Sequence, residues 1–327
     1  MKRPILLQNI CKEKEWGGST VTKMFGITSP FEKTGEVWTA SAHQNGETPV
    51  TIYDGNDSQT HILSQYYKED KQREIFGYNC RAYEEFPLLA KWIDANDNLS
   101  VQVHPDDEYA INVLNSYGKT EAWYIVSAKK GAQIVYGLKK GTTKAAFIDA
   151  VKQNRIKDVL NFIPVKAGEV YYIPSGMVHA LLDGVVVYEI QQSSDITYRV
   201  YDWDRNDPNR PLEIKKALDV INFEKNDEYI QGKPVDEFGR LITPYFNFTL
   251  NKVETIYSRL YVHKSSFKLC SVLDGSITIK DPYYESIQVN AGNSFILPCA
   301  EYWFPFRYIG WEYPISGSGI VLESTVN

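Results

Sequence analysis

Short runs in which apolar and polar residues alternate dominate this chain. Clear examples are EVWTASAH (36–43), AWYIVSA (122–128), AQIVYGL (132–138), VVVYEIQQ (185–192) and DITYRVYDW (195–203). A period of two residues is typical of strands, and the Gly and Pro residues between the runs indicate tight turns. We therefore expect a mainly β protein whose antiparallel sheets pack as sandwiches or close into barrels.

Four stretches lack this alternation and are predicted to be helical. They are 58–76, 106–116, 142–160, with Thr142 or Thr143 as its N-cap, and 211–221. A charged segment with Gly and Pro, 222–242, is a candidate linker. We expect residues 1–235 to form one domain with helical insertions and 236–327 to form a smaller all-β domain.

The strand predicted over 99–104, LSVQVH, places unusual polar residues on one face. Leu99, Val101 and Val103 alternate with a serine, an amide and an imidazole, Ser100, Gln102 and His104. If this face of the strand were exposed to solvent, we would expect Lys, Thr or Glu at these positions. We therefore expect these three polar residues to face the interior of a barrel, with Pro105 ending the strand.

Two segments of the chain form a partial internal repeat. VKAGEVYYIPSGMVHAL (165–181) and VNAGNSFILPCAEYWF (289–304) share the Ala-Gly pair and the spacing from Gly to Pro, but only the first continues to a histidine, His179. The pattern Gly-x5-Pro-x-Gly-x2-His resembles the second motif of the cupin superfamily. This resemblance implies two cupin-type jelly-roll barrels, with a few short helices packed on the N-terminal one, and a C-terminal barrel that lacks a metal.

In the cupin resemblance the inward histidine is a metal ligand. It implies a metal site of Gln102, His104, Glu121 and His179, and two imidazoles, a carboxylate and an amide oxygen form a plausible set for one zinc ion. Two other readings stay open. Each histidine fits a hydrogen-bonded core position, and Gln102 fits a hydrogen bond to a ligand instead of direct contact with the metal.

Composition and charge exclude several classes of protein. With 35 Lys and Arg against 41 Asp and Glu, the net charge is −6, which argues against a general binder of nucleic acid or anionic membranes. The four cysteines are scattered without a Cys-x-x-Cys pair, no apolar run approaches a membrane span, and the N-terminus is unlike a signal peptide. We expect a cytoplasmic protein with no membrane or nucleic-acid partner.

Several segments, separated along the chain, together form a series that resembles one enzyme family. They are GEVWTASAHQNGETPV (35–50), FPLLAKWIDANDNLSVQVHPDD (86–107), GKTEAWYI (118–125) and QQSSDITYRVYDWDR (191–205). The series resembles type I mannose-6-phosphate isomerase in its short bacterial form. The resemblance implies a zinc-dependent interconversion of mannose 6-phosphate and fructose 6-phosphate, with Arg199 catalytic and with Ser100, Lys119 and Glu189 in the pocket. The partner is then a small hexose phosphate, and the chain a monomer or homodimer.

The chemistry of an aldose–ketose isomerase assigns roles to these residues. The reaction passes through a cis-enediol, for which Glu189 is a reasonable general base and Arg199, which stays charged, a clamp for the enediolate oxygens. Lys119 fits either a proton shuttle or a phosphate ligand. Lys91 is a candidate for substrate binding, as is Arg205, and His43 is a candidate for sugar ring opening.

Two other functions fit parts of the pattern. One is a catalytically inactive cupin that binds a sugar phosphate as a regulator, and the presence of all four metal positions together with Lys119 and Arg199 argues against it. The other is a metal-dependent dioxygenase, which usually needs more imidazoles than the two found in these motifs.

Overall fold

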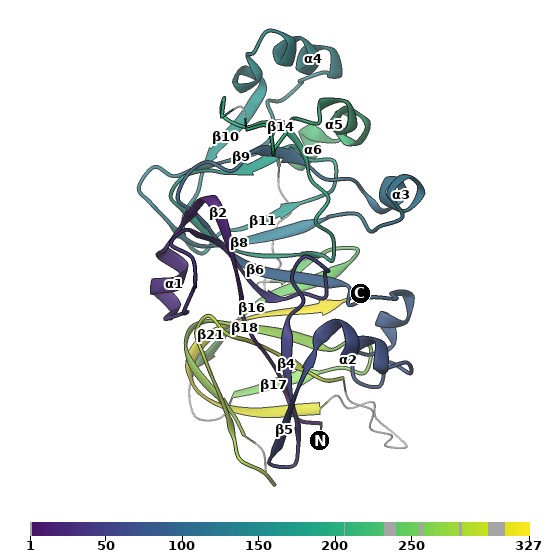
Figure 1. Ribbon diagram of the computed structural model, residues 1–327, viewed down its shortest axis with the longest axis vertical. Helices are drawn as coiled ribbons and strands as arrows, with labels where there is room; N and C mark the ends of the chain where they lie inside the picture. The colour runs from purple at the N-terminus through teal and green to yellow at the C-terminus, as the bar shows by residue number, and fades with distance from the viewer. Residues whose placement is uncertain (1, 206, 232–239, 255–257, 281–282, 300–310) are drawn as a thin grey trace.

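A computed structural model describes residues 2–205, 207–231, 240–254, 258–280, 283–299 and 311–327. Two curled β units lie one above the other along the long axis, and the chain ends both lie by the lower one (Figure 1). The described strands form three antiparallel sheets, as the alternating pattern predicts. Among the described residues, no helix has the length and apolarity needed to span a bilayer.

The upper unit is a sandwich of two sheets. The first has five strands in the order β10 (Leu160–Pro164), β9 (Gln133–Leu138), β12 (His179–Leu181), β7 (Val101–Val103) and β14 (Tyr198–Tyr201). The second has six in the order β11 (Val170–Ile173), β8 (Glu121–Ala128), β13 (Val185–Gln192), β6 (Leu88–Ala95), β3 (Thr34–Ala40) and β2 (Ile10–Gly18).

The lower unit is built on one ten-stranded sheet. Its main path runs β15 (Arg240–Ile242), β16 (Phe246–Glu254), β21 (Trp311–Val326), β18 (Lys268–Ile279), β20 (Ser294–Leu297), β1 (Ile5–Leu7), β4 (Pro49–Asp54) and β5 (Asp57–Ile62). Strand β17 (Ser258–Val262) pairs with β21, and β19 (Ile287–Asn290) pairs with β18. Three strands from the first 62 residues thus extend the sheet of the C-terminal strands, while the boundary at residue 235 stays a prediction.

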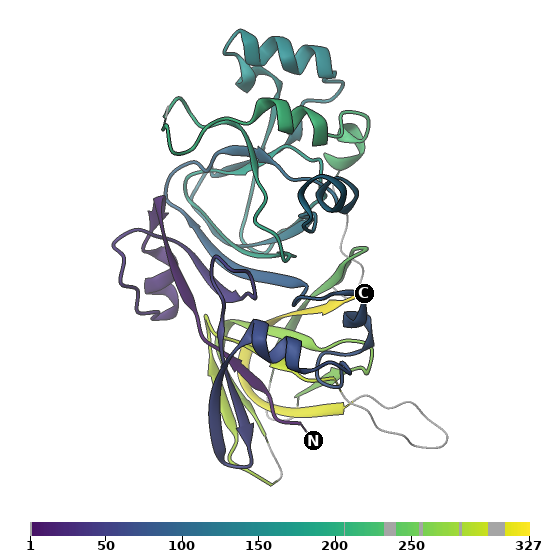
Figure 2. The same cartoon turned by 45° about the vertical axis from the view of Figure 1, so that its right-hand side comes forward.

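The helices are short, and most of them belong to the upper unit. They are α1 (Thr20–Phe25), α2 (Leu63–Glu69), α3 (Asp107–Tyr109), α4 (Lys144–Lys152), α5 (Ile214–Val220) and α6 (Asn226–Tyr229), with 3₁₀ turns η1 (Tyr78–Ala82) and η3 (Ile156–Val159) and a π-helical turn η2 (Ala110–Leu114). Phe147 of α4 and Ala217 of α5 pack with Val101 and Val103 on the outer face of the five-stranded sheet. Both views show α4 and α5 above this sheet (Figure 2).

The helix predicted over 58–76 is wrong at both ends, because the observed helix α2 spans only Leu63–Glu69. Residues 57–62 form strand β5, which makes a hairpin with β4, and the helix α2 starts only at Leu63. The reason is the turn before it, where Gly55 adopts φ +63° and reverses the chain directly into a second strand. Tyr67 of α2 packs on Phe76 and Phe86, and these two rings contact Phe267, so this helix belongs to the lower unit.

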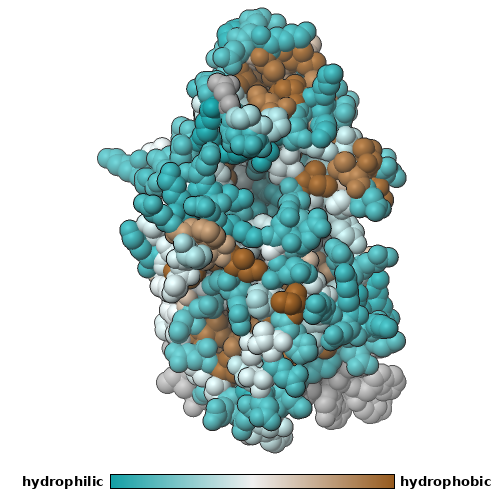
Figure 3. All heavy atoms as spheres, viewed as in Figure 1, coloured by the Kyte–Doolittle hydropathy of each residue, from teal (hydrophilic) through white to brown (hydrophobic). Residues whose placement is uncertain are grey.

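Alternation along the six-stranded sheet separates a core from a pocket. Ala90, Trp92 and Tyr188 belong to a large apolar cluster that also contains Ile296 and Leu322 of the lower unit. The residues between them on the same strands point the opposite way, into the upper unit. The exposed surface is mostly hydrophilic, with apolar groups gathered near α3 and α4 (Figure 3).

Candidate functional site

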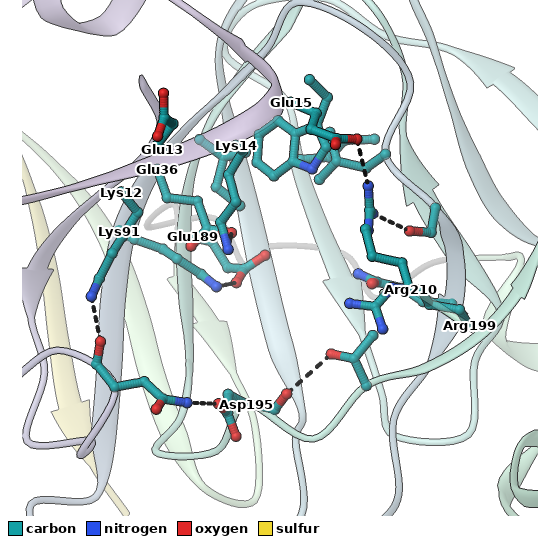
Figure 4. A pocket seen from close by; sticks show the side chains of 18 of the residues that line it. Lys12, Glu13, Lys14, Glu15, Glu36, Lys91, Glu189, Asp195, Arg199 and Arg210 are labelled. Carbon is teal, nitrogen blue, oxygen red and sulfur yellow. Dashed lines mark hydrogen bonds and ion pairs between the residues drawn. The ribbon is translucent and has the colours of Figure 1, made fainter. Parts of the chain in front are cut away.

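A polar cavity of about 800 Å³ opens between the two sheets of the upper unit. Six residues of the predicted site line it: Ser100, Gln102, Lys91, Lys119, Glu189 and Arg199. Their neighbours in the lining include Lys12, Lys14, Glu36, Trp38, Trp123, Asp195 and Arg210 (Figure 4). The cavity is large enough for a small polar metabolite.

Strand register places one row of the site across the five-stranded sheet. His179 of β12 lies opposite Gln102 of β7, and Gln102 lies opposite Arg199 of β14. The turn before His179 is tied to the same strand, because the Gly176 N–H donates to the His104 carbonyl at 2.9 Å. Gly176 has φ +84°, and an added Cβ there would lie 3.0 Å from the Cβ of Asn222. Glycine is therefore required in the turn that positions His179.

Three buried residues converge beside this row. The ligand-type atoms of His104, Glu121 and His179 all lie within 4.8 Å of one another, and no other group of three or more His, Cys, Asp or Glu in the described residues does the same. His179 Nε2 lies 3.3 Å from Glu121 Oε1, and His104 Nε2 lies 3.6 Å from Glu121 Oε2. This group can hold a metal ion.

Both imidazoles are oriented by backbone carbonyls. His104 Nδ1 donates to the Ile196 carbonyl at 2.8 Å, and His179 Nδ1 donates to the Met177 carbonyl at 2.9 Å. The proton on each Nδ1 leaves the Nε2 lone pair directed at the group, which is the usual arrangement of metal-bound histidine.

Two acceptors therefore face each other without a proton between them. Glu121 Oε1 is buried and has no hydrogen-bond partner among the described residues, and its neighbour His179 Nε2 is itself an acceptor in this tautomer. A buried pair of acceptors is costly unless a cation lies against it. The Gln102 amide is 3.4 Å from His179 Nε2, and turning it over would present its oxygen to the same point. The donor set thus fits a dication of the zinc type.

The Lys119 ammonium is the cation beside these atoms. Its Nζ lies 2.6 Å from Glu121 Oε2 and 3.0 Å from His104 Nε2. Burial would raise the pKa of Glu121, but Lys119 and the imidazoles hold it well below its usual range. Burial and Lys119 both lower the pKa of His104, so this histidine stays neutral at ordinary pH. A neutral imidazole next to a carboxylate is ready to bind metal without losing a proton.

A second row crosses the facing six-stranded sheet. Trp38, Lys91, Glu189 and Trp123 lie opposite one another on β3, β6, β13 and β8. Lys91 Nζ lies 2.9 Å from Glu189 Oε1, and Trp123 Nε1 donates to Glu189 Oε2 at 2.7 Å. The Trp123 ring also contacts the edge of His179. Trp123 therefore contacts both the Glu189 carboxylate and His179 of the His104–Glu121–His179 group.

Glu36 extends the charge network of the second row. Its Oε2 accepts from Trp38 Nε1 at 2.7 Å, and its Oε1 lies 3.6 Å from Lys14. Burial would raise the pKa of Glu36, but Lys91 and Lys14 lower it to about 2. Burial works against the charge of Lys91, yet Glu189 and Glu36 raise its pKa above the usual value. Both residues are therefore charged in the folded protein.

Two guanidinium groups, Arg199 and Arg210, form the opposite wall of the cavity. Figure 4 shows them side by side, facing the Lys91–Glu189 pair across the cavity. Arg210 donates to Ser100 Oγ at 2.8 Å and lies 3.7 Å from Asp202. Arg199 makes no ion pair among the described residues, and burial and Arg210 both lower its pKa. Arg210 also lies 3.8 Å from Glu15 Oε2 and is partly compensated, whereas Arg199 has a charge without an ion-pair partner among the described residues and suits an anion.

Two predicted residues lie away from the cavity. His43 is outside its lining and instead lines a smaller adjoining hollow, where its Nε2 is 3.3 Å from Asp195 Oδ1. Arg205 is held by Asp202 at 3.0 Å and by Asp97 at 2.9 Å, so its interactions are structural. Neither residue lines the main cavity, and a contact between His43 and the substrate stays a prediction.

The lining also contains residues that the sequence pattern did not single out, among them Glu36, Trp123, Lys14 and Arg210. Glu36 and Trp123 have a signal that period-two analysis can find, because Glu36 precedes buried Val37 on β3 and Trp123 shares β8 with Glu121. Lys14 has no such signal, since it lies between Glu13 and Glu15 on β2. Arg210 follows the loop after β14, where no periodicity exists. Only the fold brings it to Ser100.

The fold and the site define a jelly-roll protein with a buried metal-type group below a polar, cation-rich cavity. Comparisons with known proteins make the assignment specific. The family described as "Phosphomannose isomerase type I, catalytic domain" matches residues 5–149. A curated "Mannose-6-phosphate isomerase" of Streptococcus mutans is 38% identical over 309 residues, covering 91% of this chain and 93% of that protein. The chain belongs to the type I phosphomannose isomerase family.

Two further similarities support this membership. The "Probable mannose-6-phosphate isomerase GmuF" of Bacillus subtilis is 39% identical over 306 residues, which cover 91% of this chain and 94% of that protein. The crystal structure of the mannose 6-phosphate isomerase from Bacillus subtilis superposes with a TM-score of 0.83 at 32% identity, covering 99% of both chains. The expected cupin-type β fold is thus confirmed.

Proposed function

We propose that this chain interconverts mannose 6-phosphate and fructose 6-phosphate through a cis-enediol, with one zinc ion held by His104, Glu121 and His179 and completed by Gln102. The observation that carries the proposal is the position of the His–Glu–His group next to a cavity that has both a carboxylate wall and an arginine wall. Family membership supports the reaction, and the donor set supports the metal.

Zinc in this group would act as a Lewis acid toward the oxygens on C1 and C2 of the sugar. One carboxylate and neutral imidazoles leave a bound dication with net positive charge. Lys119 Nζ lies within hydrogen-bond distance of Glu121 Oε2 and His104 Nε2, two of the atoms that would hold the metal. Lys119 is therefore at the metal end of the cavity, and its ammonium would have to give up the contact with His104 Nε2 for a metal to bind there.

Glu189 is the proposed base. It takes the proton from C2 of the aldose and returns it to C1, which moves the carbonyl from C1 to C2. Lys91 and Trp123 hold one oxygen each, so the carboxylate has a fixed orientation and its remaining lone pairs are available. Lys91, expected to contact the substrate, serves here to hold the base.

Lys119 is the proposed carrier of the proton that moves between the two sugar oxygens. Its position beside Glu121 favours this role over phosphate binding. An ammonium can give a proton to one oxygen and regain it from the neighbouring one without a net change of charge.

Arg199 and Arg210 are the proposed anion ligands. The phosphate carries nearly two negative charges at neutral pH, and a guanidinium can bind it through two parallel hydrogen bonds. Arg210, which already holds Ser100, suits the phosphate. Arg199 lies opposite Gln102 in the row that leads to His179, so it suits the developing enediolate charge.

A coupled assay of mannose 6-phosphate turnover tests the proposal. Protein stripped of metal by a chelator should lose turnover and regain it with Zn²⁺ but not with Mg²⁺, because nitrogen ligands disfavour Mg²⁺. Full turnover by metal-free protein would exclude the zinc site. Tight binding of the sugar phosphate by zinc-loaded protein without turnover would indicate the regulator instead.

A further inference from the structure

His43 makes contacts that suit a structural task. Its Nδ1 accepts from the Asn45 N–H at 3.2 Å, so the ring proton is on Nε2, which points at Asp195 Oδ1 at 3.3 Å. The Asn45 side chain donates to the other carboxylate oxygen, Oδ2. His43 and Asn45, which follow β3, therefore contact both carboxylate oxygens of Asp195.

Asp195 lies on the loop that joins β13 to β14. The next residue, Ile196, provides the carbonyl that accepts from His104 Nδ1 at 2.8 Å. In the described part of the chain, polar side chains outside the loop contact residues 195–197 only at the Asp195 carboxylate and the Ile196 carbonyl. His43 and Asn45 thus fix the loop at Asp195. One residue further along, the Ile196 carbonyl accepts the hydrogen bond from His104 of the His104–Glu121–His179 group.

The orientation of His104 depends on that acceptor. With its Nδ1 proton on the Ile196 carbonyl, the ring presents the Nε2 lone pair to Glu121 and His179. If the loop moved by a fraction of an ångström, the hydrogen bond would lengthen and the ring would turn. Groups that orient a ligand through a hydrogen bond typically change metal affinity about 10- to 100-fold when removed.

We propose that His43 and Asn45 are positioning residues that act through Asp195 and the Ile196 carbonyl on the metal ligand His104. This inference rests on the proposed function, since it takes His104 to bind zinc. It gives His43 a place outside the sugar pocket, in contrast to the ring-opening role expected from the sequence. The adjoining hollow that His43 lines shares Asp195 and Thr197 with the main cavity, so these residues are the wall between the two.

The test compares four variants as full-length protein. H43A removes the donor to Asp195, H43Q replaces it with an amide N–H, and D195A releases the loop. Q44A is the matched control, because Gln44 is exposed and lies beside His43. Zinc affinity is measured by competition with a chromophoric chelator, and ligand geometry by the visible absorption of the Co²⁺-loaded protein.

The expected zinc affinity is about tenfold weaker in D195A, the lower end of the range for such partners. H43A, one contact further away, should weaken it by about threefold to tenfold, with a shifted Co²⁺ spectrum. H43Q should restore both values to near those of the parent, and Q44A should change neither. An unchanged affinity and spectrum in H43A, with reduced turnover, would overturn the proposal and favour ring opening.

A measurement on metal-free protein separates this proposal from the metal assignment. The Nδ1 proton of His104 should give a slowly exchanging signal in ¹H–¹⁵N spectra of the imidazoles. H43A should speed up its exchange with solvent, whereas Q44A should not. If the parent protein binds no zinc, the proposed function fails, while this signal still decides whether His43 holds the loop. Equal exchange in H43A and parent protein would contradict the proposal.

Discussion

The two β units use similar strand frameworks with opposite interiors. In the upper unit the inward positions carry His104, Glu121 and His179 below an open cavity. In the lower unit the inward positions form an apolar cluster that includes Val272, Ile277, Phe295, Leu297 and Tyr313. The turn at the start of the repeated segment is shared, because Gly168 and Gly292 have φ +94° and +82°. The framework therefore tolerates either interior, and the inward side chains decide which one forms.

The comparison also shows which part of the molecule supports the sheet beside the cavity. The wall behind the cavity is well packed, since Trp92 and Tyr188 belong to the core shared by the two units. Hydrogen bonds cross this boundary as well: one joins the hydroxyls of Tyr188 and Ser271 at 2.9 Å, and Trp92 Nε1 donates to the Gly292 carbonyl at 3.2 Å. We infer that apolar packing against the lower unit stabilises the six-stranded sheet, whose other face carries the charged residues of the cavity.

Removal of His179, a proposed metal ligand, should have the largest effect on the interior of the upper unit. His179→Ala should weaken zinc binding by more than about 100-fold, beyond the range for residues that only orient a ligand, and should abolish turnover. Elemental analysis and the coupled assay measure both. Normal zinc content in this variant would remove His179 from the ligand set.

Arg199→Ala should separate chemistry from metal binding in the upper unit. Loss of a group that stabilises developing negative charge should lower turnover by about 100- to 1,000-fold. Zinc content and the far-ultraviolet circular dichroism spectrum should be unchanged. Near-normal turnover would exclude Arg199 from the mechanism.

Phe295→Ala should lower the stability of the lower unit and leave zinc binding in the upper unit unchanged. Phe295 is fully buried in the apolar cluster, and its truncation should cost about 3–5 kcal/mol of the free energy of unfolding. Urea denaturation measures the loss, and zinc affinity below the unfolding transition should stay at the parent value. A large drop in zinc affinity without loss of stability would show that the units are more tightly coupled than the packing indicates.

Acid should destabilise the charged interior through Glu36. Its pKa is about 2 in the folded protein against 4.5 for the free side chain, so ionisation contributes to stability above pH 4.5 and is lost as the pH falls toward 2. The full contribution is about 3 kcal/mol, of which about 2 kcal/mol should disappear between pH 6 and pH 3. Urea unfolding at several pH values should show this slope in the parent protein and a smaller one in E36Q. Equal slopes would contradict the pKa assignment.

The outer surface of the upper unit should be the most tolerant region. Thr143 caps α4 by accepting from the Ala146 N–H at 3.2 Å. Thr143→Ala should cost about 1 kcal/mol by thermal or urea unfolding, while turnover and zinc affinity stay the same. Reduced zinc affinity would connect α4 to the site in a way that its outer position does not explain.

Much of the site could be predicted because strand periodicity is local. The alternation in 99–104 separated Val101 and Val103, which pack outward, from Ser100 and Gln102, which line the cavity. The resemblance of the Gly-x5-Pro-x-Gly-x2-His motif to the cupin superfamily pointed to His179, which is buried beside Glu121. The helix expected from residue 58 was placed too early, since a two-residue turn redirected the chain into β5.

What the sequence by itself determined is therefore which residues share a face of a strand, because that depends only on the backbone period of two. Tertiary structure alone decided how the strands pair: it set Glu189 opposite Lys91, brought Arg210 to Ser100 and added β1, β4 and β5 to the lower sheet. It also placed His43 outside the lining of the main cavity and against Asp195. These contacts join residues far apart in the chain, and no local pattern encodes the register that unites them.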